Sequence, residues 1–224
     1  MSAGGWVVLL PVKSPQQGKS RLGAIADDDR ALLADAFARD TVRACEEAAS
    51  VRALVIVSDD LDFAATLSDA ASTLLCADPG DGLNAALRAA AALARAHHPQ
   101  RRAVALLADL PALRGEHLDV VLGALAADGP EGTERAEGAE GTAHVVIDAD
   151  GTGTTLYTAG WDAFDPRFGA GSAARHRAAG ARDLTSVPAA LRRDVDDAAS
   201  LADAIALGVG EATARALRTI AERS

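Results

Sequence analysis

The stretch WVVLLPVKSPQQGKSRL, residues 6–22, joins an apolar run to a basic loop. The apolar part, Trp6–Val12, is typical of a strand buried on both faces, as the strands of parallel sheets are. The loop after it carries Lys13 and Lys19, the only two lysines in the 224-residue chain. In open α/β sheets, ligands bind beyond the carboxyl ends of the strands. The two lysines therefore predict an anionic ligand at the end of this strand.

Apolar runs alternate with helical patterns along the rest of the chain, which predicts a mixed, mostly parallel sheet flanked by helices. Asp27 to Asp29 are expected to supply the N-cap and the acidic first turn of a helix. A chain of this length can form one sizeable core, so residues 1–224 are expected to form a single α/β domain. The further strands are expected at residues 53–57, 73–76, 103–107, 144–147, 154–158 and 191–195. The other helices are expected at about residues 83–96, 116–126, 197–207 and 211–222.

The composition limits the kinds of partner. The formal net charge is −10, whereas a general nucleic-acid-binding protein needs a basic surface. No stretch approaches the roughly 18 consecutive apolar residues of a membrane helix, and the N-terminus lacks the pattern of a secretion signal. Cys45 and Cys76 stand at no metal-ligand spacing and are expected to be reduced thiols. We therefore expect a cytoplasmic protein that acts on small molecules, with no nucleic-acid or membrane partner.

Residues 128–142 interrupt the alternating pattern. Their sequence, DGPEGTERAEGAEGT, is rich in glycine and glutamate and has no apolar period. Such a composition cannot bury enough apolar surface to order itself. We expect a solvated insertion between the two halves of the domain.

The tripeptide Gly18-Lys19-Ser20 matches the end of a Walker A phosphate loop. A Walker A loop has another glycine five residues before this one, but Lys13 occupies that position, and Pro15 removes a backbone donor. The loop is therefore not a Walker A motif. Its two ammonium groups, the Ser20 hydroxyl and the Arg21 guanidinium still suit a polyphosphate, although an ordinary basic surface loop remains an alternative.

Two separated segments carry carboxylates in positions that suit a metal ion. Asp109 follows the predicted strand at 103–107, and Asp194 and Asp196 have the same parity in an extended segment, so both point to one side. Phosphoryl and nucleotidyl transfers use Mg²⁺ held by one or two carboxylates together with the substrate phosphates. The alternative for Asp196 or Asp197 is to cap the helix that follows.

Several motifs together resemble one family, the 2-phospho-L-lactate or phosphoenolpyruvate guanylyltransferases of coenzyme F-420 biosynthesis. The most specific motif is PRFGxxSxxRH, and the resemblance runs from about Trp6 to Ala216. The family pattern does not require the insertion at 128–142, and it most often has a residue other than Ala108 before the strand-end aspartate. The motifs are PVKSPQQGKSRL (11–22), DGLNAAL (81–87), ADLPAL (108–113), GTGT (151–154), DPRFGAGSAARH (165–176) and LRRDVDDAASL (191–201).

The resemblance implies a Rossmann-like nucleotidyltransferase fold of the GT-A-like type. It also implies a reaction that joins the GMP part of GTP to a phosphorylated three-carbon acid and releases pyrophosphate. Asp109 and Asp194 match the aspartates that bind the magnesium cofactor. Thr154, Gly169 and Ser172 match the positions that hold the acid.

The nucleotide side of the site follows from the same resemblance. Lys13, Lys19, Ser20 and Arg21 fall on the loop that binds the nucleotide, and Lys19 and Arg21 are expected to act in catalysis by stabilising charge on the phosphates. Asn84 falls on the loop near the guanosine. The acceptor is left open between phosphoenolpyruvate, 2-phospho-L-lactate and 3-phosphoglycerate, as is the oligomeric state.

Two other functions remain as alternatives. A molybdopterin guanylyltransferase or a sugar-nucleotide transferase would begin with LAGGxGxRMG-K, and here Pro11–Gln17 replaces those glycines. A non-catalytic guanine-nucleotide-binding domain would not need the aspartate pair.

Four further features after residue 142 could have either a structural role or a role in the site. GTGT could be a simple hairpin turn or could offer backbone N–H groups to the acid. His176 is expected on a helix surface rather than in catalysis. Arg167 and Arg175 could pair with the acid or with nearby carboxylates.

Overall fold

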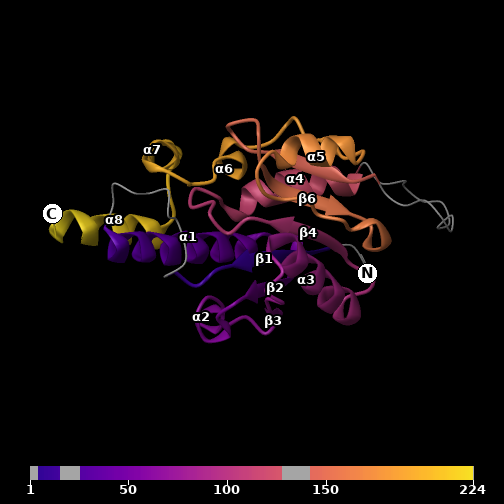
Figure 1. Ribbon diagram of the computed structural model, residues 1–224, viewed down its shortest axis with the longest axis horizontal. Helices are drawn as coiled ribbons and strands as arrows, with labels where there is room; N and C mark the ends of the chain where they lie inside the picture. The colour runs from indigo at the N-terminus through magenta and orange to yellow at the C-terminus, as the bar shows by residue number, and fades with distance from the viewer. Residues whose placement is uncertain (1–4, 16–25, 128–141, 224) are drawn as a thin grey trace.

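The computed structural model describes residues 5–15, 26–127 and 142–223. The strands of these residues form a seven-stranded sheet in the order β3-β2-β1-β4-β6-β5-β7 (Figure 1). Only β6 runs antiparallel to its neighbours β4 and β5, so the predicted mixed, mostly parallel sheet is confirmed. The strands are β1 (Trp6–Val12), β2 (Val51–Ser58), β3 (Thr73–Ala77), β4 (Arg102–Leu106), β5 (His144–Ile147), β6 (Thr154–Ala159) and β7 (Arg182–Asp183).

Helices cover both faces of the sheet. Alternate residues of β1 point to opposite faces, so Val8 and Leu10 pack with α1 and α4, and Val7 and Leu9 pack with α3 and α5. None of the described helices is both long and apolar enough to cross a membrane. The helices are α1 (Asp27–Glu47), α2 (Leu61–Ala65), α3 (Leu83–His97), α4 (Gly115–Ala127), the 3-10 helix η2 (Trp161–Ala163), α5 (Ser172–Ala178), α6 (Ala189–Arg192), α7 (Ala198–Leu207) and α8 (Glu211–Arg223).

The C-terminal helices pack on the first half of α1, and α8 lies alongside it (Figure 1). The buried Asp40 of α1 accepts hydrogen bonds from the backbone N–H groups of Ala212 and Thr213, at 3.0 and 2.9 Å. These N–H groups are in the first turn of α8, which has no intrahelical partners for them. Gly210 lies against Asp40, since a Cβ there would come within 2.3 Å of the carboxylate. Asp40 therefore fixes where α8 begins.

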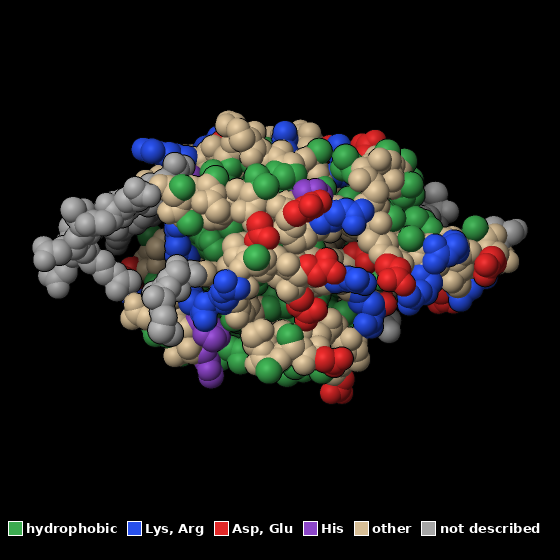
Figure 2. Space-filling model, turned by 180° about the vertical axis from the view of Figure 1, so that it is seen from behind, with side chains coloured by type: hydrophobic (Ala, Val, Ile, Leu, Met, Phe, Trp, Pro, Cys, Tyr) green, Lys and Arg blue, Asp and Glu red, His purple; other side chains and the backbone are tan. Residues whose placement is uncertain are grey.

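Charged side chains of opposite sign are interspersed over the face seen in Figure 2. Arg95 and Asp162 form an ion pair at 2.7 Å, and Arg88 and Asp165 form one at 3.5 Å. Such exposed pairs contribute little to stability.

Two local predictions are wrong. Ala26, not Asp27, precedes the first turn of α1, and no side chain caps it, although the three aspartates do lie in that turn. The expected strand at 191–195 is instead α6 and an irregular segment, and the last strand of the sheet is β7. Pro188, with φ −55° and ψ 137°, is the extended residue that precedes the first turn of α6. A five-residue apolar run does not distinguish a strand from a helical turn.

The predicted insertion at 128–142 lies almost entirely outside the described residues, which resume at residue 142.

Replacing Asp40 should destabilise the fold through α8. In Asp40→Ala, two buried N–H groups lose their acceptor, so the free energy of unfolding should fall by about 2 kcal/mol in urea titrations. Glu47→Ala, which removes an exposed partner of Arg43 on the same helix, is the matched control and should cause a smaller loss. Equal losses in the two variants would contradict the role given to Asp40.

Candidate active site

The described candidate residues gather at one edge of the sheet. Lys13 and Ser14 follow β1 at this edge, and Asp109 follows β4. Because β6 runs opposite to its neighbours, it begins at the edge where they end, which places Thr154 there, close to Asp148 at the end of β5. The exposed side chain of Lys13 is therefore at the predicted edge. Lys19, Ser20 and Arg21, the other predicted nucleotide-loop residues, lie outside the described residues.

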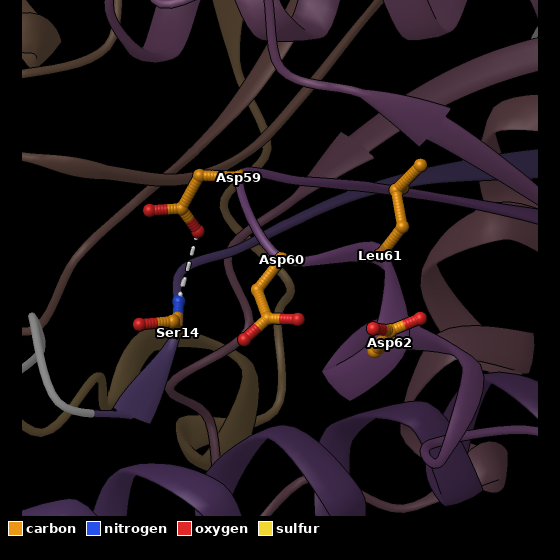
Figure 3. Close-up of a pocket in the computed structure, with 5 residues that line it drawn as sticks. All are labelled: Ser14, Asp59, Asp60, Leu61 and Asp62. Carbon is orange, nitrogen blue, oxygen red and sulfur yellow. Dashed lines mark hydrogen bonds between the residues drawn. The ribbon is translucent and has the colours of Figure 1, made fainter.

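A hollow of about 380 Å³ opens at the ends of β1 and β2 (Figure 3). The Ser14 N–H donates to Asp59 at 3.0 Å, which joins the loop after β1 to the loop after β2. Asp60 accepts from the Phe63 N–H at 2.9 Å and caps α2. The three aspartates of the lining would repel a phosphate and suit a group that donates hydrogen bonds. The lining residues are Ser14, Asp59, Asp60, Leu61 and Asp62.

The two predicted metal ligands come together from distant parts of the chain. The Val195 N–H donates to the Asp109 carbonyl oxygen at 3.1 Å, and the Ala149 N–H donates to the Arg192 carbonyl oxygen at 2.8 Å. These bonds flank Asp194 and hold its segment against the turn after β4 and the hairpin after β5. The structure therefore brings Asp109 and Asp194 to one place, as the sequence predicts.

The turn that carries Asp109 is held from α1. The Thr41 hydroxyl, which is fully buried, shares its one hydrogen between the carbonyl oxygens of Phe37 at 2.9 Å and Ala108 at 3.1 Å, and it accepts from the Leu110 N–H at 3.3 Å. One side chain thus bonds the backbone on both sides of Asp109. Ala108 itself contributes its carbonyl oxygen and packs against the core.

The electrostatics of this cluster suit a cation. The pKa of Asp194 is raised to about 7, first by burial and then by the negative charges of Asp109, Asp196 and Asp148. A bound divalent cation would relieve this repulsion. In the described part of the chain, no three acidic, histidine or cysteine side chains form a ready metal site. Two carboxylates suit an ion that takes its remaining ligands from a substrate, as Mg²⁺ commonly does.

Asp197 has the structural role that was one of its alternatives. Its carboxylate accepts from the Ser200 N–H at 2.8 Å, and the Ser200 hydroxyl accepts from the Asp197 N–H at 2.9 Å, which forms a capping box at the start of α7.

Thr154 and Ser172, the two hydroxyl residues predicted to hold the acid, are neighbours in the structure. Their hydroxyl oxygens are 3.1 Å apart, and both side chains are buried. Gly169 has a φ of +111°, a conformation that side chains rarely adopt, and it begins the turn that leads to Ser172. That these three residues bind the acid stays a prediction.

The GTGT segment forms the hairpin between β5 and β6. The Asp148 carboxylate accepts from the N–H groups of Thr152 and Gly153 at 3.0 and 2.7 Å. A Cβ at Gly153 would come within 2.2 Å of that carboxylate, which explains the glycine. These two N–H groups are therefore used within the hairpin rather than offered to the acid.

Asn84 is bound to the loop that precedes Gly169. Its amide nitrogen donates to the Phe168 carbonyl oxygen at 3.1 Å, and its amide oxygen accepts from the Phe168 N–H at 2.8 Å. The pair links the start of α3 to the residue before Gly169. Its predicted position near the guanosine stays a prediction.

Among the described residues, the Arg175 guanidinium binds backbone carbonyl groups rather than the nearby carboxylates that were one of its two expected partners. Its guanidinium donates to the backbone carbonyl oxygens of Arg167, Phe168 and Ala170, the last at 2.6 Å. Arg167 pairs with the carboxylate of Asp165 at 2.8 Å, which was one of its two expected roles. Arg175 thus fixes the loop by turning its carbonyl groups inward.

His176 was missed by the sequence reasoning, which placed it on a helix surface. Only 1% of its surface is exposed, and its ring stacks on Tyr157 with centroids 4.9 Å apart. The seven-residue helix α5 is too short to show an apolar period that would reveal this burial.

Comparison with known proteins places the chain in a family. A phosphoenolpyruvate guanylyltransferase of Streptomyces scabiei is 46% identical over 219 residues, which cover 94% of this chain and 95% of that protein. A protein of the same name from Nocardia farcinica is 42% identical and covers 95% of this chain and 90% of its own. The chain belongs to the phosphoenolpyruvate guanylyltransferase family. No protein-family model matches it.

Solved structures support the fold of this family member. A candidate nucleotide-diphospho-sugar transferase from Desulfovibrio desulfuricans G20 aligns with a TM-score of 0.57 at 20% identity, over 92% of this chain and 97% of that one. The Rv0371c protein of Mycobacterium tuberculosis H37Rv aligns with a TM-score of 0.54 at 19% identity, over 90% of this chain and 98% of that one. The predicted Rossmann-like nucleotidyltransferase fold is confirmed.

The carboxylate cluster should cost stability when no cation is bound. Because the folded-state pKa of Asp194 is raised, the folded protein loses stability relative to the unfolded chain as pH rises from about 4 to about 7. Without metal, Asp194→Asn should therefore be more stable than the unaltered protein above pH 7, by about 1–3 kcal/mol.

The difference should vanish near pH 4, where both side chains are neutral. Urea unfolding in EDTA at pH 4, 6 and 8 measures it. A variant that is less stable at pH 8 would contradict the repulsion described above.

Proposed function

We propose that this chain transfers GMP from GTP to phosphoenolpyruvate and releases pyrophosphate, as a step of coenzyme F-420 biosynthesis. The observation that carries the proposal is the meeting of the Asp109–Asp194 carboxylate pair and the Thr154–Ser172 hydroxyl pair at one edge of a nucleotidyltransferase sheet. The similarity to phosphoenolpyruvate guanylyltransferases supports the choice of substrates.

The reaction needs no general base. A phosphate oxygen of the acceptor, already deprotonated at neutral pH, attacks the α-phosphorus of GTP. A new oxygen–phosphorus bond forms, the bond between the α-phosphorus and the bridging oxygen breaks, and pyrophosphate leaves with the electron pair. The obstacle is repulsion between two anions, so charge stabilisation and in-line placement supply the catalysis.

Asp109 and Asp194 would hold magnesium, which would neutralise charge on the phosphates. The pKa of Asp194 is raised to about 7, so a large fraction of this side chain is protonated at neutral pH. A cation at this position would favour the charged carboxylate and lower that pKa. Asp148 adds negative charge to the site while it holds the hairpin N–H groups.

Each end of the substrates has candidate partners. Lys13, with Lys19 and Arg21 beyond the described residues, would bind the phosphates of GTP. The hollow beside Ser14 is lined by carboxylates, which accept hydrogen bonds from groups such as the N1–H and amino group of guanine. Thr154 and Ser172 would bind an anionic group of the acceptor.

Pyrophosphate release by the purified protein tests the function. The protein would be given magnesium and GTP with phosphoenolpyruvate, 2-phospho-L-lactate or 3-phosphoglycerate in parallel. Release with phosphoenolpyruvate that is absent with ATP and abolished by EDTA is the expected result. Preferred release with 2-phospho-L-lactate would keep the reaction and change the acceptor. No release with any acid, despite GTP binding, would favour the non-catalytic guanine-nucleotide-binding domain.

The metal assignment has its own prediction. Asp109→Asn and Asp194→Asn should each lower kcat by about 100-fold or more, because each removes a charged ligand. Both variants should keep the circular dichroism spectrum of the unaltered protein. Asp183→Asn, at the exposed partner of Arg177, is the control and should keep full activity. Near-normal kcat in either site variant would remove the metal assignment.

A further inference from the structure

His176 lies between the loop at 167–168 and the hydroxyl pair. One ring nitrogen, Nε2, is 2.8 Å from the backbone nitrogen of Arg167, and the other, Nδ1, is 3.1 Å from the Thr154 hydroxyl oxygen. The ring is packed between Tyr157, on which it stacks, and the edge of Phe168, whose centroid is 5.5 Å away. Its position is therefore fixed by aromatic contacts as well as by hydrogen bonds.

The contact with Arg167 determines which ring nitrogen carries the proton. A backbone N–H can only donate, so Nε2 must accept and carries no hydrogen. Burial, together with the nearby charge of Arg175, lowers the pKa of His176 to about 4, so the ring is neutral at physiological pH. A neutral ring keeps one hydrogen, which must be on Nδ1. The Nδ1–H then faces the Thr154 hydroxyl oxygen at 3.1 Å and also the backbone of Ser172, so Nδ1 cannot accept a hydrogen from Thr154.

The protonation of Nδ1 determines how many hydroxyl hydrogens are left for a ligand. Thr154 and Ser172 have two hydroxyl hydrogens between them, and one is used in the hydrogen bond that joins them. With Nδ1 as donor, the second hydrogen is left over. If Nδ1 were instead the acceptor, it would take that hydrogen, and the pair could offer a ligand none.

We propose that His176 is a positioning residue that makes the Thr154–Ser172 pair a hydrogen-bond donor to an anionic oxygen of the acceptor acid. The inference rests on the proposed function in that it takes this pair as the acceptor site. His176 acts through Thr154 and does not touch the substrate. The Arg167 N–H, on the loop that leads to Gly169, determines the tautomer of the His176 ring.

The tautomer can be measured without any activity. Long-range ¹H–¹⁵N spectra of the protein at neutral pH should show one histidine that is protonated at Nδ1 and not at Nε2, and this signal should be missing from His176→Gln. Free histidine favours the other tautomer, so the result is specific to this contact. A His176 signal protonated at Nε2 would overturn the inference even if the enzyme is fully active.

Two substitutions separate the two hydrogen bonds. Asparagine at 176 places an amide near the position of Nδ1 and can still donate to Thr154, whereas glutamine places its amide near Nε2 and cannot. His176→Gln removes the donor that fixes the rotation of the Thr154 hydroxyl, so the spare hydrogen is no longer held toward the ligand. KM for the acceptor acid should therefore rise by about tenfold, with KM for GTP and the melting temperature little changed. His176→Asn should retain most of the acceptor affinity. His97→Gln, at an exposed histidine of α3, is the control.

A double-mutant cycle tests whether His176 acts through Thr154. Thr154→Val removes the hydroxyl, so adding His176→Gln to it should raise the acceptor KM little further. Fully multiplicative effects, or equal losses of affinity for GTP and acid, would show a general structural role and overturn the inference. If the unaltered protein releases no pyrophosphate with any acid, the proposed function fails and this inference fails with it, whatever the tautomer.

Discussion

Repulsion between carboxylates is the constraint around which this edge of the sheet is built. Burial raises the pKa of Asp194, and the nearby negative charges of Asp109, Asp196 and Asp148 raise it further, to about 7. Backbone contacts hold these segments together against the repulsion: the Val195 N–H donates to the Asp109 carbonyl oxygen, and the Arg192 guanidinium donates to the carbonyl oxygens of Ile147 and Asp148 at 2.9 Å. A site of this kind is less stable than it could be because its charges are arranged for a ligand.

The loop at residues 167–170 is organised by a different means. Three side chains bind the backbone of residues 167–170: Asn84 from α3, and Arg175 and His176 from α5. A loop with two glycines in left-handed conformations has little preference of its own for one shape. The hydrogen bonds from these three side chains fix one conformation of the loop, and in that conformation Ser172 lies beside Thr154.

The fold could be predicted from the sequence wherever the pattern is long or unambiguous. The β1 strand, Trp6–Val12, has the predicted bounds, and α3, α4, α7 and α8 begin and end within about two residues of those expected. The nearness of Asp109 and Asp194 was expected from the family resemblance, and their backbones are joined by the Val195-to-Asp109 hydrogen bond. The prediction of a strand from Leu191 was wrong because a short apolar run suits either a strand or the single helical turn that α6 forms. His176 and Asn84 could not be placed, since their roles depend on backbone atoms of a distant loop, and sequence periodicity says nothing of those.

The Val195-to-Asp109 contact has a consequence for the order of events during synthesis. The strands β1 to β4 can pair as they leave the ribosome, since domains fold progressively from the N-terminal side. At that stage Asp109 stands without Asp194, and the growing chain carries neither the clustered charge nor a complete pair of carboxylates. The nascent protein therefore does not experience the repulsion between these carboxylates until translation has passed Val195.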